Sequence, residues 1–174
     1  MSNAVIDALI SRRSIRQFKP ELPPEEMITE IIRCGTYAAT GRNYQSPRII
    51  RISDPAEQAA MRKLNAEIMG NRDIDPFYGA PVILLVVADR RRPTYLYDGS
   101  LVIGNLMLAA HSLGLGRCWI HRAKEEMETS WGKALLRKVG LSDDYEGIGH
   151  CAIGFADMPL PEPPPRREDY VLTD

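Results

Sequence analysis

The segment 82–87 constrains the fold of this chain more than any other segment. Its residues, Val-Ile-Leu-Leu-Val-Val, are too few for a helix and too uniformly apolar for a strand with one face in water. The segment therefore predicts a strand that is covered on both faces. A second segment, from about Tyr97 to Leu113, is almost entirely apolar or small. A helix that is apolar on all sides is buried, and small residues such as Gly104 let a neighbour approach closely.

Other segments predict helices around this strand. Apolar residues recur at helical spacing from about Ala4 to Arg12, and Pro24 suits the first position of a second helix. Further helices are expected near 55–69 and 131–139, and further strands near 49–52, 117–120 and 150–155. Helices around a small central sheet give the class α+β.

Length and charge exclude several classes of protein. The 174 residues fit one domain, and 22 basic against 23 acidic residues provide no overall field for nucleic acid or an anionic membrane. The longest apolar run is too short to span a membrane, and the charged N-terminus does not read as a signal peptide. Three cysteines without CxxC spacing favour a reducing, cytoplasmic location, and the histidines form no metal-binding pattern.

The most informative polar cluster is Arg12, Arg13, Ser14 and Arg16, where the first helix gives way to extended chain. Alternate residues of an extended segment point the same way, so Ser14 and Arg16 can face one ligand, with Arg12 close by. Guanidinium groups and a hydroxyl suit a phosphate. The alternative is a solvated basic helix end, and spacing alone favours that alternative.

Three other features each have a plain structural explanation as well. Asn43 and Gln45 lie in a loop and can pair with the edge of a flat heterocycle, although the residues taken alone favour turn chemistry. The Gly114-Leu115-Gly116 turn follows a helix and does not match GxGxxG, so it predicts no Rossmann phosphate loop. Arg166 and Arg167 follow a proline run and form either an exposed basic tail or a second phosphate contact.

Four stretches, taken together and in order, resemble the nitroreductase family of FMN-dependent oxidoreductases. AVIDALISRRSIRQF resembles the opening helix with its Arg-Arg-Ser-x-Arg motif, and CGTYAATGRNYQSP resembles the Pro-Ser-x-x-Asn-x-Gln-Pro-Trp loop. YDGSLVIGNLMLAAHSLGLGRCWI is similar to the central Asp-led helix and Gly-Leu-Gly-x-Cys-Trp turn, and HCAIGFADMPLPEPPPRR to the late strand and Pro-rich, Arg-ending segment. Two departures are Ala39-Thr40 for Pro-Ser, in which Thr40 keeps the hydroxyl, and Gln45-Ser46-Pro47 for Gln-Pro-Trp.

The resemblance implies a nitroreductase-like α+β fold with a small, mostly antiparallel mixed sheet, in an intertwined homodimer. Residues 1–174 would form one FMN-binding domain, with 156–174 a Pro-rich extension on the partner subunit. The implied activity is ping-pong hydride transfer from NADH or NADPH through FMN to an electron-poor acceptor, such as a nitroaromatic or a quinone. Alternatives are a flavin-cleaving or flavin-carrying relative, a flavin-dependent dehalogenase or dehydrogenase, and an anion- or nucleic-acid-binding module.

The resemblance also implies roles for individual residues, with no catalytic side chain and no metal. Arg12 and Ser14 would hold the FMN phosphate and ribityl chain, helped by Arg166 or Arg167, and Arg13 would also bind the cofactor. Arg16 would lie near N1 and O2 of the ring and favour its reduction. Asn43 and Gln45 would reach the ring edge from the partner, and Thr40 would also bind the cofactor. Backbone groups of Gly114, Leu115, Gly116, Ile148 and Gly149 would flank the ring, and the short 89–98 region implies an open site.

Overall fold

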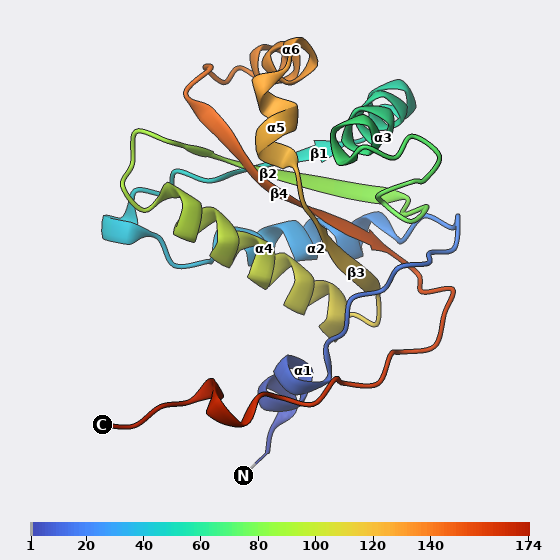
Figure 1. Ribbon diagram of the computed structural model, residues 1–174, viewed down its shortest axis with the longest axis vertical. Coiled ribbons are helices and arrows are strands. Elements are labelled where there is room, and N and C mark those ends of the chain that lie inside the picture. The colour runs from blue at the N-terminus through green and yellow to red at the C-terminus, as the bar shows by residue number, and fades with distance from the viewer. Residues whose placement is uncertain (1) are drawn as a thin grey trace.

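A four-stranded sheet lies between two layers of helices in the computed structural model, which describes residues 2–174 (Figure 1). The strands are β1 (Arg48–Ile52), β2 (Val82–Asp89), β3 (Gly116–Ile120) and β4 (Tyr145–Gly154), in the order β1-β2-β4-β3. The α+β class is confirmed. The sheet was expected to be mostly antiparallel, and each of its three strand pairs within the described chain is antiparallel.

The helices divide between the two faces of the sheet. Those on one face are α2 (Glu25–Thr36) and α4 (Tyr95–Ser112), and those on the other are α3 (Pro55–Met69), α5 (Ala123–Glu128) and α6 (Ser130–Lys138). The second helix starts one residue later than predicted, because Pro24 keeps an extended ψ of 141° and caps the helix through its carbonyl. The six-residue α5 was not predicted, because it is too short to show a helical period.

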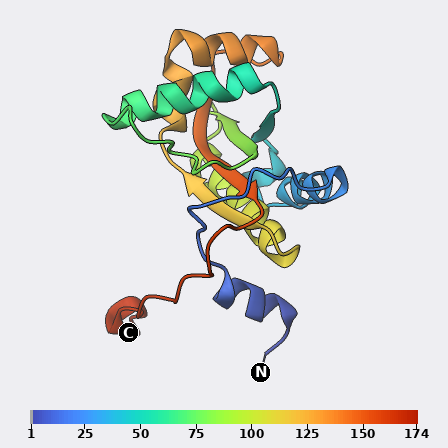
Figure 2. The same ribbon diagram turned by 90° about the vertical axis from the view of Figure 1, so that its right-hand side faces the viewer.

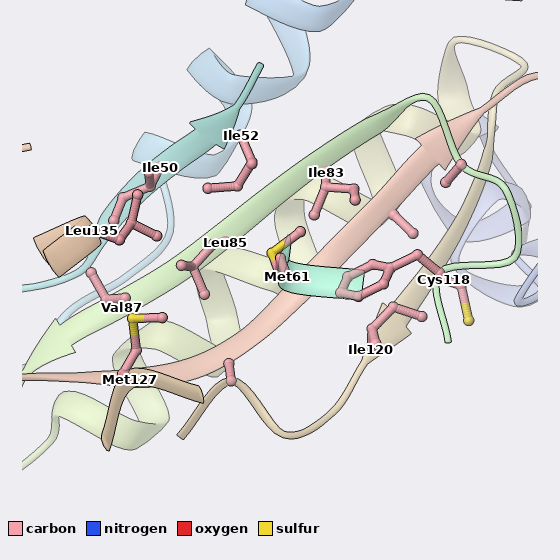
Figure 3. Close-up of a cluster of buried hydrophobic side chains, with 14 of the residues drawn as sticks. Ile50, Ile52, Met61, Ile83, Leu85, Val87, Cys118, Ile120, Met127 and Leu135 are labelled. Carbon is pink, nitrogen blue, oxygen red and sulfur yellow. The ribbon is translucent and has the colours of Figure 1, made fainter. Parts of the chain in front are cut away.

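The central strand β2 explains how the two layers are held together. All eight of its residues are buried, as the apolar run predicted. Val82, Leu84 and Val86 pack toward α2 and α4. The alternate residues Ile83 and Leu85 pack on the opposite face against a cluster that includes Met61 of α3, Ile120 of β3 and Met127 of α5 (Figure 3).

The two ends of the chain project from the same end of this body (Figures 1 and 2). The first helix, α1 (Ala4–Ser11), buries none of its residues, and Val5, Leu9 and Ile10 are 60–68% exposed. The proline-rich extension remains attached up to Ala156, which bridges to Phe18, and is largely exposed beyond Met158. None of the helices in residues 2–174 is long and apolar enough to cross a membrane.

Candidate functional site

The basic segment after α1 crosses the outer edge of strand β3. The backbone N–H of Ile15 donates to the carbonyl of Arg117, at 2.9 Å, and this bond fixes the segment against the strand. Burial raises the pKa of the Cys118 thiol, and Arg16, the Ser14 hydroxyl and Arg12 act on that pKa in the opposite direction. The structure therefore brings three residues of the predicted basic motif close to Cys118 on β3.

Two arginines of this segment have buried nitrogen atoms without a hydrogen-bond partner. These atoms are Nη1 of Arg12 and Nε of Arg13. Arg13 also caps α1, because its Nη1 donates to the carbonyls of Ile10 and Arg12 at 2.6 and 2.8 Å. Among residues 2–174, neither arginine has a carboxylate within salt-bridge distance. A buried donor without a partner is costly, so these groups favour an anionic ligand.

Arg117 belongs to this cluster, although the sequence analysis did not select it. Arg117 is only 3% exposed, and its Nη1 donates to the Leu115 carbonyl at 2.8 Å. Its Nε and Nη2 are buried without a partner. Burial, together with the charges of Arg12 and Arg13, lowers the pKa of Arg117 to about 10. The sequence offered one signal for this residue: Arg117 begins the short predicted strand 117–120, whose other residues are apolar.

A cavity of about 220 Å³ opens beside Arg117, at the C-terminal end of α4, and its wall includes apolar residues such as Met158 and Leu160. Arg117, His111 and Gly114 lie in its wall. Burial and the neighbouring arginines lower the pKa of His111, whose Nε2 lies 2.7 Å from the Ser11 hydroxyl. His111 is therefore mainly neutral at pH 7 and adds little positive charge. In the described chain, no three His, Cys, Asp or Glu side chains gather to hold a metal ion.

The predicted amide loop lies at the other end of α4. Asp98, which is 3% exposed, holds it there by accepting hydrogen bonds from the Gly41 N–H and the Thr94 hydroxyl, both at 3.0 Å. The Arg92 guanidinium lies over the Tyr44 ring, 4.7 Å from its centroid. Asp98 was noted in the sequence only as the start of a motif. Its structural role is to fix the position of this loop.

The residues predicted to meet a ring edge lie together in this loop. Gln45 donates from its side chain to Asn43, at 2.9 Å, and from its backbone to the Thr40 hydroxyl, at 3.2 Å. Arg42, Asn43 and Gln45 all have positive φ angles, of 51°, 55° and 47°. Such conformations store strain for residues other than glycine, and they cluster at ligand-binding sites. Both amide side chains are exposed and available to a ligand.

The amide loop and the arginine cluster are separated by the length of α4. The helix has 18 residues, which at 1.5 Å per residue span about 27 Å. Asp98 in the first turn holds the amide loop, and Leu115 begins the segment beside the arginines just after the last turn. One chain therefore presents the two predicted halves of the site at opposite ends of a helix.

The residues predicted to flank a ring are mostly buried. Leu115 is 1% exposed, Ile148 is 7% exposed, and Gly149 is buried. Ile148 sits at a β-bulge, because Val86 pairs with Gly149 and the next residue pairs with Gly147. Their burial leaves little surface for direct contact with a ligand. These residues can instead pack under the residues that form the surface of the site.

The two glycines of the predicted turn differ in their surroundings. Gly114 is exposed, with a φ of +77° that favours glycine, and it follows α4. Gly116 is buried, and a Cβ atom there would lie 3.1 Å from both Ile15 and Phe18. Gly116 therefore lets the basic segment pack closely on β3. Gly114 serves to end the helix, as the sequence predicted.

The two arginines of the C-terminal tail stay outside the arginine cluster within the described chain. Arg166 and Arg167 are both exposed, and Arg167 forms an ion pair with Asp169 at 2.7 Å. The contact between this tail and a phosphate therefore stays a prediction.

Comparison with known proteins gives a consistent result. The Nitroreductase family model matches residues 9–155. The FMN reductase (NADPH) of Bacillus subtilis is 25% identical over 142 residues, which make up 72% of this chain and 57% of that protein. The chain therefore spans less than two thirds of this relative.

Solved structures show the same fold. A nitroreductase with bound FMN from Bacteroides fragilis superposes with a TM-score of 0.88 at 20% identity, covering 99% of this chain and 100% of that one. Iodotyrosine deiodinase bound to FMN and 3-iodo-L-tyrosine superposes with a TM-score of 0.77 at 21% identity, covering 98% and 97%. Since the family model spans most of the sequence and the fold agrees over the full length, this chain belongs to the nitroreductase family.

Proposed function

We propose that the chain is an FMN-dependent oxidoreductase that acts as a homodimer. Its substrates would be NADH or NADPH as hydride donor and a small electron-poor acceptor, such as a nitroaromatic or a quinone. The observation that carries this proposal is the pair of buried, unpartnered guanidinium nitrogens of Arg12 and Arg13, close to the Ser14 hydroxyl. This donor set fits a phosphate monoester, which is the anionic end of FMN.

Relatives support the choice of ligand. The relative from B. subtilis is named an FMN reductase, and the two compared structures contain FMN. In this chain, Arg12, Arg13 and Ser14 would hold the phosphate. The exposed Arg16 would lie against the pyrimidine edge of the ring. A positive charge there stabilises the negative charge that reduction adds, and so favours reduction.

The position of the two halves of the site supports the homodimer. Because α4 separates the amide loop from the arginines by about 27 Å, one cofactor can use both only if they come from different subunits. A twofold axis across antiparallel α4 helices places the loop of one copy near the arginines of the other. The α4 face available for this contact includes Tyr97, Leu101 and Gly104, which are all exposed.

The protein would contribute position and charge to the reaction. When bound, FMN supplies the hydride transfer between the nicotinamide and the acceptor. Asn43 and Gln45 of the partner would orient the ring edge through their amide groups. Leu115, Ile148 and Gly149 would support the site from beneath. The exposed tail, including Arg166 and Arg167, would pack on the partner and add positive charge to the phosphate.

A second candidate activity is reductive dehalogenation of an aromatic substrate. It is favoured by the match to iodotyrosine deiodinase, which covers almost all of both chains. Since one fold supports several reactions, the acceptor must be identified by assay.

The first experiment measures flavin content and turnover. Purified protein is expected to be yellow, to release FMN on denaturation, and to oxidise NADH or NADPH with a nitroaromatic or a quinone. Turnover with only an iodinated phenol would instead favour dehalogenation. Colourless protein that refuses added FMN and remains monomeric would contradict the proposal.

Two substitutions separate the roles of the arginines. Arg12→Ala is expected chiefly to release FMN, while Arg16→Ala is expected to retain FMN but slow its reduction. Each lost charge-assisted hydrogen bond costs about 1.5–3 kcal/mol, or roughly 10- to 150-fold. Arg33→Ala is the matched control, because Arg33 is an exposed arginine of α2 that already pairs with Glu30. Equal effects of both substitutions on FMN affinity and on reduction would contradict these roles.

A further inference from the structure

We propose that Arg117 is an additional phosphate-binding residue, which contacts the FMN phosphate from the α4 side of strand β3. This inference rests on the proposed function and adds to it a residue that the Arg-Arg-Ser-x-Arg motif does not contain. Arg117 pairs in register with Ile153, whose side chain packs toward α4, while the neighbouring Cys118 faces the opposite layer. The guanidinium of Arg117 therefore points to the α4 side of the sheet, where the charges of Arg12 and Arg13 act on it.

The surroundings of Arg117 contain positive charge and no compensating carboxylate. The positive charge comes from Arg12 and Arg13 of the segment after α1, while the mainly neutral His111 of α4 adds little. Within residues 2–174, Arg117 makes no salt bridge. Burying a charged group without a partner is strongly unfavourable. An anion bound between these arginines would remove that penalty.

The unpartnered atoms of Arg117 form one edge of the guanidinium. Nη1 is fixed by the Leu115 carbonyl, whereas Nε and Nη2 are both free. These two donors make the parallel fork that matches two oxygens of a phosphate. Arg117 also lines the cavity of about 220 Å³, which greatly exceeds the volume of one water, about 30 Å³. The donor geometry therefore fits a phosphate, which would reach the two covered donors from the cavity that Arg117 lines.

The test compares two flavins that differ only in the phosphate. Protein freed of flavin is titrated with FMN and with riboflavin, and binding is followed by quenching of flavin fluorescence. Arg117→Met is expected to weaken FMN binding about 10- to 100-fold while leaving riboflavin binding unchanged. Arg117→Lys keeps the charge but loses the fork, so it should restore part of the FMN affinity. Arg33→Met is the control and should change neither affinity.

A second readout protects the test against a simple folding defect. In flavin-free protein, Arg117→Met removes a buried unpaired charge, so its thermal midpoint should equal or exceed that of the wild-type protein. Inorganic phosphate should raise the midpoint of the wild-type protein more than that of the Met variant.

Three results would overturn the role of Arg117: equal loss of FMN and riboflavin affinity, unchanged FMN affinity, or a strongly lowered midpoint without flavin. Failure of the wild-type protein to bind either flavin would instead refute the proposed function.

Discussion

Gly104 is the position at which the proposed dimer can be broken without disturbing the single chain. It lies in the interior of α4, is exposed, and a Cβ atom there would have no neighbour within 4 Å. Tyr97 and Leu101, which are 70% and 51% exposed, lie on the same face of the helix. A side chain at position 104 would therefore contact atoms of a second subunit and none of its own chain.

The structure gives opposite expectations for the chain and for the dimer when Gly104→Glu is made. In the isolated chain, glycine is about 0.8–1 kcal/mol less favourable than alanine in a helix interior, and glutamate is close to alanine. The monomer should therefore become slightly more stable. Across a twofold axis, overpacking costs about 1–3 kcal/mol, and two like charges near 4 Å apart add about 1–4 kcal/mol. The dimer should weaken by at least about 2 kcal/mol, or roughly 30-fold.

Sedimentation velocity across a concentration series measures the dimer, and circular dichroism measures the fold. Gly104→Glu is expected to sediment as a folded monomer that has lost most of its FMN affinity, because the amide loop of the partner is gone. Ala59→Glu is the matched control, since Ala59 is an exposed helical residue of α3. A Gly104→Glu protein that remains dimeric with wild-type FMN affinity would refute an interface centred on α4.

Three further predictions concern stability. Burial acts to raise the pKa of Asp75, but Arg62 and two backbone N–H groups outweigh burial and lower that pKa. Asp75→Asn should therefore lower the free energy of unfolding in urea by about 1–2 kcal/mol at pH 7. This difference should shrink as the pH falls below 3.8, the ordinary pKa of an aspartate. Glu126→Ala removes a fully buried carboxylate that lies 2.8 Å from the His150 imidazole and accepts a hydrogen bond from Asn65, so it should cost about 1–3 kcal/mol in the same assay; a loss under 1 kcal/mol would contradict these contacts. Asp98→Ala should speed hydrogen exchange in the amide loop and leave exchange in the β2 core unchanged.

The sequence by itself determined the central framework. The run 82–87 specified a strand covered on both faces, because six residues are too few for a helix and the run is too uniformly apolar for a strand with one face in water. The helix predicted at 55–69 occurs at those residues, and the buried helix before Gly114 occurs with small shifts at its ends. Local periodicity and turn chemistry were enough for these elements, since both act between residues close in sequence.

The basic segment was also found from sequence, because Arg-Arg-Ser-x-Arg is a contiguous pattern. The sequence did not decide whether this segment binds a phosphate, since a solvated helix end has the same local spacing. The tertiary structure adds that nitrogen atoms of Arg12 and Arg13 are buried without partners, and phosphate binding at this segment stays a prediction. Burial depends on which distant segments pack over a residue, and no local pattern carries that information.

Tertiary structure alone decided three features of the candidate site. Arg117 joins the arginines because Ile15 pairs with β3 across a hundred residues of sequence. Ile148 turns into the core at a β-bulge, which is a matter of strand register. The amide loop and the arginines lie about 27 Å apart because α4 runs between them. Each feature depends on how segments far apart in sequence pack together. Long-range packing sets that arrangement, and local residue preferences do not.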